Sequence, residues 1–196
     1  MGTIAEKYGL SFEKIAALSL DAFERHIPLA EYRQYFRTFP GEHYRVLAYL
    51  SQRTDGMLLF DVGTLYGYSA LAMATNSRNT VVSYNIKEQR LLAHAEELPN
   101  IEFCVGDVLG DERLARADMI LLDTAHEGPF EHLFLDQLLK RQFQGLLILD
   151  DIHLNPMMEE FWKGVPCAKE DVTPLAHCSG TGLVLCSEPP WRTSSD

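Results

Sequence analysis

The chain has 196 residues, of which 46% are hydrophobic and 23% charged, a composition that suits one globular domain with a full core and disfavours two domains. Its formal net charge of -11 is not offset by any basic stripe, which disfavours nucleic acid as a partner. No apolar run approaches the roughly 20 residues that span a bilayer, and no basic segment followed by an apolar one opens the chain, so the sequence predicts neither a membrane anchor nor export.

The first part of the chain, residues 1–56, is predicted to form a helical cap over a sheet. Helical patterns run between about residues 11 and 53. Pro28 can open one of these helices, because its fixed φ suits the first helical turn. Gly41 separates that helix from a second one, which carries Tyr44 and Leu47 on one face.

Strands and helices alternate from residue 57 to residue 187. Strand-like runs cover residues 57–62, 80–85, 101–105, 119–123 and 146–150, with helical stretches near 68–75, 88–98 and 130–141 and a closing pair of strands at 168–173 and 182–186. This βαβ rhythm predicts an α/β fold with a mainly parallel sheet and helices on both faces, in which ligands bind beyond the carboxyl ends of the strands. Residues 188–196 are expected to form a loose tail.

The most informative segment is residues 58–74, LLFDVGTLYGYSALAMA, which predicts a strand, a glycine loop and a helix. Its apolar run ends in Asp61, and the chain then turns at Gly63 and Gly67. Two glycines let the backbone approach a ligand closely, so the loop favours a small polar ligand, with an ordinary tight turn as the alternative. The spacing Gly-x-x-x-Gly differs from the Gly-x-Gly-x-x-Gly of dinucleotide sites, and no Lys-Ser/Thr follows for a phosphate.

With an acid two residues before its first glycine, this segment resembles motif I of class I S-adenosylmethionine (SAM) dependent methyltransferases, a Rossmann-like family. The resemblance implies that the acid lies near the methionine end of the cofactor and that the loop passes under it. The residues that the resemblance assigns to SAM are Asp61, Gly63, Thr64, Gly67, Tyr68, Ser69, Asn85, Asp107 and Asp123.

Two of these residues follow the second and third predicted strands. Asn85 stands where the family has an acid that binds the two ribose hydroxyls. An amide oxygen accepts one hydrogen bond without the assistance of a charge, so the exchange is expected to cost on the order of 1 kcal/mol of cofactor affinity. Asp107 stands where the family has an Asp that approaches the adenine amino group, although a plain Gly-Asp turn would also explain it.

Three carboxylates, Asp123, Asp150 and Asp151, end the fourth and fifth predicted strands. Adjacent strand ends bring such groups together, and they repel one another unless they are protonated, hydrogen-bonded or bridged by a hard cation such as Mg²⁺, Mn²⁺ or Ca²⁺. Solvated turn residues and helix N-caps are the alternative. Over roughly residues 57 to 187, the chain resembles the metal-dependent small-molecule O-methyltransferases of the catechol and caffeoyl-CoA type, and bacterial enzymes that act on natural-product and sugar hydroxyls.

The resemblance implies a divalent cation at Asp123, Asp150 and Asp151, with Asp151 in place of the Asn of the catechol type. It also implies a base at His126, which replaces the Lys of the family's Asp-x-x-Lys. Histidine has an ordinary pKa that suits proton acceptance near neutrality. His126 is therefore the predicted catalytic base, whereas His43 and His153 are expected to be surface or structurally hydrogen-bonded residues.

Other chemistries are disfavoured by the spacing of the residues that they need. The chain has no Cys-x-x-Cys and no pair of histidines with the spacing of a metal motif, which disfavours zinc, and it has no Gly-x-Ser-x-Gly for a hydrolase. Irregularly spaced cysteines indicate reduced thiols in a cytoplasmic protein; they are Cys104, Cys167, Cys178 and Cys186.

The sequence thus predicts a Rossmann-like class I methyltransferase fold that transfers a methyl group from SAM to a hydroxyl of a small molecule. The acceptor site is expected to come from the N-terminal helices, from loops at strand ends, or from the second subunit of a homodimer. Two alternatives remain open. One is a catalytically silent binding or interaction protein with the same fold, which Asn85 favours, and the other is a nucleotide-binding oxidoreductase.

Overall fold

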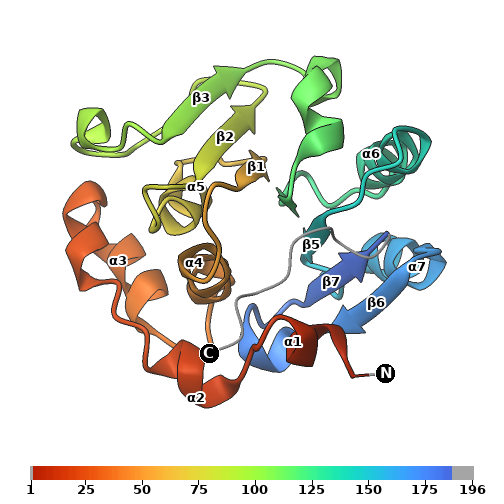
Figure 1. Ribbon diagram of the computed structural model, residues 1–196, viewed down its shortest axis with the longest axis horizontal. Coiled ribbons are helices and arrows are strands. Elements are labelled where there is room, and N and C mark those ends of the chain that lie inside the picture. The colour runs from red at the N-terminus through yellow and green to blue at the C-terminus, as the bar shows by residue number, and fades with distance from the viewer. Residues whose placement is uncertain (1, 187–196) are drawn as a thin grey trace.

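The structure, a computed structural model, describes residues 2–186, so the loose tail predicted at 188–196 lies outside the described residues. Its centre is a seven-stranded sheet in the order β3-β2-β1-β4-β5-β7-β6 (Figure 1). β7 runs antiparallel to both of its neighbours, and the other pairs are parallel. The strands are β1 (Leu58–Val62), β2 (Thr80–Asn85), β3 (Ile101–Val105), β4 (Met119–Leu122), β5 (Leu146–Asp150), β6 (Ala168–Asp171) and β7 (Thr181–Leu185).

Helices cover both faces of the sheet, with α4 and α5 on one side and α6 and α7 on the other (Figure 1). Because successive strand residues point to opposite faces, Leu59 and Ile148 join the first layer, while Phe60 and Leu147 join the second. The α-helices are α1 (Ile4–Lys7), α2 (Phe12–Ala16), α3 (Ala30–Arg37), α4 (Tyr44–Gln52), α5 (Tyr68–Met73), α6 (Pro129–Lys140) and α7 (Pro156–Gly164), and the 3-10 helices are η1 (Asp21–His26), η2 (Ala95–Glu97), η3 (Val108–Gly110), η4 (Glu112–Arg116) and η5 (Thr173–Leu175).

The mainly parallel α/β fold predicted from the sequence is confirmed, but the helix predicted at residues 88–98 is wrong. The chain there forms a loop that ends in the short helix η2. Two of its backbone N–H groups donate to distant carbonyls, from Leu91 to Tyr66 at 3.0 Å and from Ala93 to His26 at 2.9 Å, and His94 has a φ of 53°. Tertiary contacts therefore outweigh the helix propensity of this segment.

The strand order reverses between β1 and β4, which makes the carboxyl ends of these two strands the switch point where α/β proteins bind ligands. The chain is very tight at this point. Gly63 has a φ of 98°, and a Cβ placed on it would lie 1.7 Å from the carbonyl oxygen of Asp123. Glycine is therefore required at this position to let the loop after β1 pass beside the end of β4.

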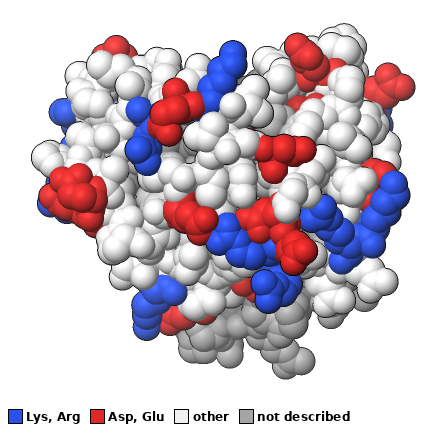
Figure 2. Space-filling model, turned by 90° about the horizontal axis from the view of Figure 1, so that it is seen from above, with Lys and Arg blue, Asp and Glu red and all other residues white. Residues whose placement is uncertain are grey.

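The surface carries charges of both signs. Figure 2 shows one face of the molecule, on which Lys and Arg side chains lie beside Asp and Glu side chains. Among the helices of residues 2–186, none combines the length and the apolar character that crossing a bilayer requires.

Candidate active site

The loop between β1 and α5 is built on a buried carboxylate. Asp61 is fully buried at the end of β1, where its Oδ2 accepts a hydrogen bond of 2.8 Å from the Ser83 hydroxyl. Burial raises the pKa of Asp61, because the charged form loses water. The backbone N–H groups of Gly63 and Thr64 both donate to the Tyr84 carbonyl, and Gly67, with a φ of 92°, begins α5. The loop is thus tied to β2 on one side and to α5 on the other.

A cavity of about 1070 Å³ opens beyond this loop, at the carboxyl ends of β1, β2 and β4. Most of the predicted site residues line it, namely Gly63, Thr64, Tyr68, Ser69, Asn85, Asp107, Asp123 and His126. Asp61, Gly67, Asp150 and Asp151 are not among its lining residues. The structure therefore brings most of the predicted SAM residues and the predicted base to one cavity, whereas Asp150 and Asp151, at the end of β5, lie outside its lining.

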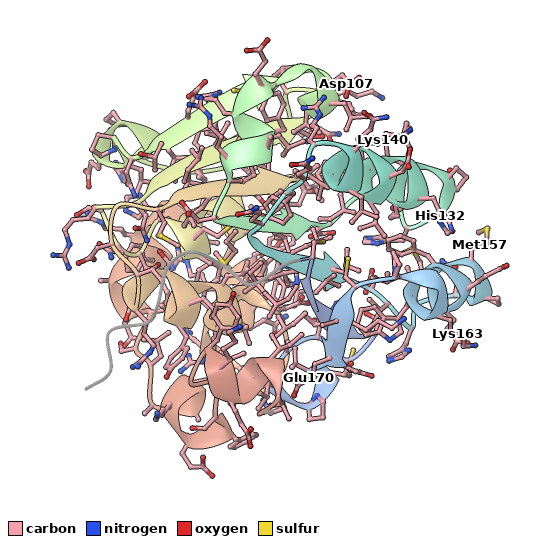
Figure 3. The ribbon with its side chains drawn as sticks, turned by 45° about the vertical axis from the view of Figure 1, so that its right-hand side comes forward. Asp107, His132, Lys140, Met157, Lys163 and Glu170 are labelled. Carbon is pink, nitrogen blue, oxygen red and sulfur yellow. The ribbon has the colours of Figure 1, made fainter. Side chains whose placement is uncertain are left out.

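The two polar atoms of the Asn85 side-chain amide differ in their hydrogen bonding. Its side-chain oxygen accepts a hydrogen bond of 2.8 Å from the N–H of Ile86, whereas its buried Nδ2 has no hydrogen-bond partner among the described residues. An unpaired buried donor is costly, so this N–H group is available to a ligand oxygen. Asp107, labelled in Figure 3, accepts a hydrogen bond from the N–H of Leu109 and caps η3.

The loop that carries His126 is held in a strained shape. His126 has a φ of 54°, which is uncommon for a residue with a side chain. Its N–H donates to the buried Glu131 carboxylate at 3.0 Å, and its carbonyl accepts from Asn155 at 2.8 Å. Glu131 also accepts from the Thr124 hydroxyl and from the N–H of Gly128. The first turn of α6 therefore fixes the position of His126.

The end of the loop packs between α6 and α7. A Cβ on Gly128 would meet the Met157 side chain at 3.5 Å, and the His132 ring lies edge-on against Phe161 with 5.0 Å between ring centroids. In Figure 3 His132 and Met157 lie on the neighbouring helices. This packing holds the first turns of α6 against α7.

His126 belongs to a closed circuit in which three carboxylates and three imidazoles alternate, and we call this circuit the acid–imidazole ring. In order around the circuit its members are His126, Asp123, His43, Asp150, His177 and Asp151. The closest nitrogen–oxygen distances between successive members are 3.2, 3.9, 3.0, 3.4, 3.1 and 3.4 Å, the last closing the circuit between Asp151 and His126.

The ring shifts the pKa values of its members. Burial opposes protonation of His43, but the nearby Asp150 outweighs this effect and raises the pKa of His43 to about 9. Hydrogen bonds to Asp150 and Asp151 raise the pKa of His177 to about 11. Although burial favours its neutral form, His43 and His177 hold the pKa of Asp150 well below its ordinary value. The imidazoles thus balance much of the negative charge of the buried carboxylates.

Asp123 and His126, which face each other near the cavity, both have a raised pKa. Burial raises the pKa of Asp123, although a hydrogen bond with His126 opposes the shift. Burial favours the neutral imidazole of His126. The hydrogen bond with Asp123 and the charges of the neighbouring carboxylates together outweigh burial, so the pKa of His126 is raised.

The sequence predicted that Asp123, Asp150, Asp151 and His126 lie close together. It did not predict that His43 joins these acids, and it did not single out His177. His43 precedes α4, and His177 lies in the connection before β7. Neither has a spacing motif with the acids, so the sequence holds no local signal for them. His153 pairs with Asp171 at 2.8 Å, outside the ring, as expected of a structurally hydrogen-bonded histidine.

The ring also contains two sets of residues whose possible ligand atoms lie within 4.8 Å of one another. They are His43 with Asp123 and Asp150, and His126 with Asp150 and Asp151. Both sets combine imidazole nitrogen with carboxylate oxygen, and such donors fit a divalent cation.

Solved structures with the same fold are methyltransferases. The SAH-bound methyltransferase PaMTH1 of Podospora anserina has a TM-score of 0.62 and 14% identity, covering 94% of this chain and 99% of that chain. The O-methyltransferase TomG from Streptomyces achromogenes, in complex with SAM, has a TM-score of 0.58 and 16% identity, covering 95% and 100%. The chain has a class I methyltransferase fold.

A third structure with this methyltransferase fold is an O-methyltransferase from Bacillus cereus in complex with SAH. Its TM-score is 0.51 at 16% identity, and the match covers 73% of this chain and 80% of that chain. No protein-family model matches the sequence. No curated protein matches it either. The methyltransferase fold is therefore established here by structure, at low sequence identity.

Proposed function

We propose that this chain transfers a methyl group from SAM to a hydroxyl of a small molecule. The observation that carries the proposal is a single cavity that joins the glycine loop after β1 to His126 and Asp123 at the end of β4. Methyl transfer needs such a shared space, because the donor and the acceptor must be aligned while water is excluded.

The residues of the β1–α5 loop fit SAM. Gly63 and Thr64 bring the backbone to the edge of the cavity, and the unpartnered Nδ2 of Asn85 offers a donor to a ribose oxygen. When bound, SAM supplies a methyl carbon, whose bond to sulfur breaks with its electron pair left on sulfur as the bond to the acceptor oxygen forms. Two of the solved structures with this fold contain SAM or SAH with an O-methyltransferase, which supports the same cofactor here.

The acceptor side of the cavity favours a flat aromatic hydroxyl. Tyr32 and Tyr35 of α3, from the N-terminal cap, line the cavity together with Phe130 of α6. The Tyr32 ring lies 5.3 Å from the Tyr66 ring and 5.5 Å from the Tyr68 ring, centroid to centroid. Aromatic walls of this kind bind planar rings with their faces and edges, so phenols and catechols are the acceptor class that the lining supports best.

His126 is the base in this proposal. Its Nε2 lies 3.2 Å from Asp123 Oδ1, its ring is mostly buried, and it lines the cavity. The neutral ring accepts the hydroxyl proton while the acceptor oxygen attacks, and Asp123 and Asp151 stabilise the imidazolium that results. A divalent cation at Asp123, Asp150 and Asp151, as predicted, would act as a Lewis acid that lowers the pKa of the acceptor hydroxyl.

Calorimetric titration with SAM and SAH tests the cofactor, and mass spectrometry of a panel of catechols, phenols and sugars incubated with SAM tests the reaction. We expect micromolar to submillimolar binding and a mass increase of one methyl group on an aromatic hydroxyl. Folded protein that fails to bind SAM at millimolar concentration would contradict the proposal and favour the silent interaction protein. Binding of NAD in place of SAM would favour the oxidoreductase.

A further inference from the structure

Two of the four cysteines lie opposite each other where β6 and β7 meet at the edge of the sheet. These strands pair antiparallel, with Ala168 of β6 opposite Leu185 of β7. Cys167 directly precedes Ala168 and Cys186 directly follows Leu185, so the same register places the two cysteines opposite each other, one residue beyond the paired strands. The sequence predicted reduced thiols because the cysteine spacing is irregular, and only the antiparallel pairing brings these two together.

The backbone hydrogen bonds show which kind of pair the two cysteines form. Opposed residues in an antiparallel ladder alternate between hydrogen-bonded and non-hydrogen-bonded pairs. The N–H of Val172 donates to the carbonyl of Thr181 at 2.9 Å, so these opposed residues form a hydrogen-bonded pair. Cys167 and Cys186 lie an odd number of pairs away along the same ladder, and they therefore form a non-hydrogen-bonded pair. The Cα atoms of such pairs lie about 4.5 Å apart, within the range of about 4.4 to 6.8 Å that a disulfide requires.

The two thiols also share one face of the sheet. Alternate residues of a strand point to the same face, so Cys186 lies on the face of Val184, which α6 and α7 cover. Both cysteines and Trp162 pack against the apolar layer on this face, and both cysteines remain partly exposed, so a small oxidant reaches them. Burial and the neighbouring Cys167 thiol raise the pKa of Cys186 to about 12, so Cys186 stays protonated near neutral pH.

We propose that Cys167 and Cys186 are a redox pair, which a peroxide oxidises to a disulfide and a thiol reductant restores. The Cys167 thiolate attacks one oxygen of hydrogen peroxide, the O–O bond breaks, and the departing hydroxide takes the proton that Cys167 released. The Cys186 sulfur then attacks the sulfur of the Cys167 sulfenic acid, the S–O bond breaks, and the departing hydroxide takes the Cys186 proton. Two thiols and one hydrogen peroxide thus give one disulfide and two waters, with sulfur oxidised and peroxide oxygen reduced.

The disulfide closes residues 167–186 into one loop, which contains β6, η5 and β7. A closed loop has fewer unfolded conformations, so the oxidised chain is expected to be the more stable one. Because β6 is an edge strand of the described sheet, the bond also ties this edge to its neighbour.

The cysteine pair lies at the opposite end of the strands from the cavity. Leu185 pairs with Leu146 at the start of β5, whereas Thr181 pairs with Asp150 at the end of β5. The cavity opens at the carboxyl ends of the parallel strands, and neither cysteine lines it. Oxidation is therefore expected to leave the affinity for SAM unchanged.

The test treats the full, reduced chain with hydrogen peroxide, blocks the remaining thiols with iodoacetamide and maps the cysteines by mass spectrometry of peptides. We expect a disulfide between Cys167 and Cys186 that dithiothreitol reverses. The oxidised chain should melt roughly 5 °C or more above the reduced chain. A folded chain that keeps both thiols free, that joins either one to Cys104 or Cys178, or that carries them as sulfinic acids would overturn the proposal. An unchanged melting temperature would overturn the stabilising effect.

Variants assign the change to the proposed pair. Cys186→Ser should abolish both the disulfide and the rise in melting temperature. The matched control is Cys104→Ser, because Cys104 is also partly buried but lies on β3, at the other edge of the sheet, and this variant should keep both. A rise in melting temperature that persists in Cys186→Ser, or that is lost in folded Cys104→Ser, would overturn the proposal. If circular dichroism shows that Cys186→Ser does not fold, Cys167→Ala replaces it, with the same expected loss.

The outcome is independent of the proposed function. SAM binding is measured by calorimetry on the reduced and on the oxidised chain. A chain that forms the disulfide but binds no SAM keeps the redox pair and loses the methyltransferase proposal. A chain that binds SAM but keeps both thiols free under peroxide keeps the methyltransferase proposal and loses the redox pair.

Discussion

His126 is the imidazole of the acid–imidazole ring that lines the cavity, and its replacement isolates its role as a base. His126→Gln should lower the methylation rate by roughly 10² or more, because the hydroxyl proton loses its acceptor, while the affinity for SAM stays nearly unchanged. Single-turnover rates and calorimetry check the two parts. Full activity of the variant would eliminate His126 as the base and direct attention to activation by a cation.

The pH profile of the same reaction follows from the environment of His126. Its carboxylate neighbours raise its pKa above the ordinary value of 6.5, and the protonated imidazole cannot accept a proton. The rate in chelator-treated buffer should therefore rise with pH through the raised pKa of His126 and level off above it. His126→Gln should lack this rise. A rate that already levels off below pH 6.5 would contradict the assignment.

Asn85 is predicted to influence the affinity for SAM. Its Oδ1 is occupied by the N–H of Ile86, so the side chain presents its N–H group. In Asn85→Asp one carboxylate oxygen can keep that bond while the other accepts a charge-assisted bond from a ribose hydroxyl, which should tighten SAM binding about fivefold. Calorimetry measures the change. Weaker binding by the variant would show that the N–H group of Asn85 contributes more to SAM binding than the charge-assisted bond that replaces it.

The positions of some site residues could be predicted from the sequence, and those of others could not. Asp123 and Asp150 end neighbouring parallel strands, whose carboxyl ends meet at one edge of the sheet, so their approach was predictable from chain order. His177 was not predictable, because it reaches the acids through the antiparallel pairing of β5 with β7, where Asp150 lies opposite Thr181. No spacing in the sequence records such a long-range contact.

At the scale of elements, the first turn of α6 positions His126 through hydrogen bonds with the loop that precedes the helix. One carboxylate, Glu131, accepts hydrogen bonds from Thr124, His126 and Gly128. Glu131→Gln replaces one acceptor oxygen by an NH₂ group, so the Gly128 N–H on one side and the Thr124 and His126 donors on the other cannot all keep their acceptor, and the loop that carries His126 should lose its fixed shape. We expect a rate about tenfold lower with unchanged SAM affinity, together with a loss of about 1 to 2 kcal/mol in the free energy of unfolding.

Two measurements separate this positioning role from a merely structural one. The pH at which the rate levels off should shift in Glu131→Gln, because His126 moves relative to Asp123, whereas simple destabilisation would leave it unchanged. The matched control is Glu127→Gln, which alters an exposed acid in the same loop and should change neither rate nor stability. An unchanged rate and pH profile in Glu131→Gln would contradict the role.

The elements themselves were largely predictable where a local pattern decides them. The predicted strands at 80–85, 101–105 and 146–150 coincide with β2, β3 and β5, because apolar runs bounded by polar turns leave one choice of register. The segment after β2 failed because its helix-forming residues are held by the carbonyls of Tyr66 and His26. Propensity is a weak guide when distant groups supply the hydrogen bonds.

At the scale of the whole molecule, the N-terminal cap depends on one buried guanidinium. Arg45 of α4 is 6% exposed and donates to the carbonyls of Ile15, Ala16, Leu18 and Phe36, which belong to α2, α3 and the chain after α2. Burial lowers the pKa of Arg45, which nevertheless stays charged because its ordinary pKa is far above neutrality. The cap also supplies Tyr32 and Tyr35 to the cavity, so its anchorage and the acceptor site are linked.

Arg45→Met should therefore affect both stability and acceptor binding. The apolar side chain fills much of the space but leaves buried carbonyls without donors, which should cost about 3 kcal/mol in the free energy of unfolding by urea. Because the loop after β1 belongs to the sheet and not to the cap, SAM affinity should change little, while KM for the acceptor should rise as α3 loosens. Arg78→Met is the control, since Arg78 forms an exposed pair with Asp55 at 2.8 Å and its loss should cost less than about 1 kcal/mol. Equal costs for the two variants would mean that the cap is held by its apolar contacts, and an unchanged KM would mean that α3 does not shape the acceptor site.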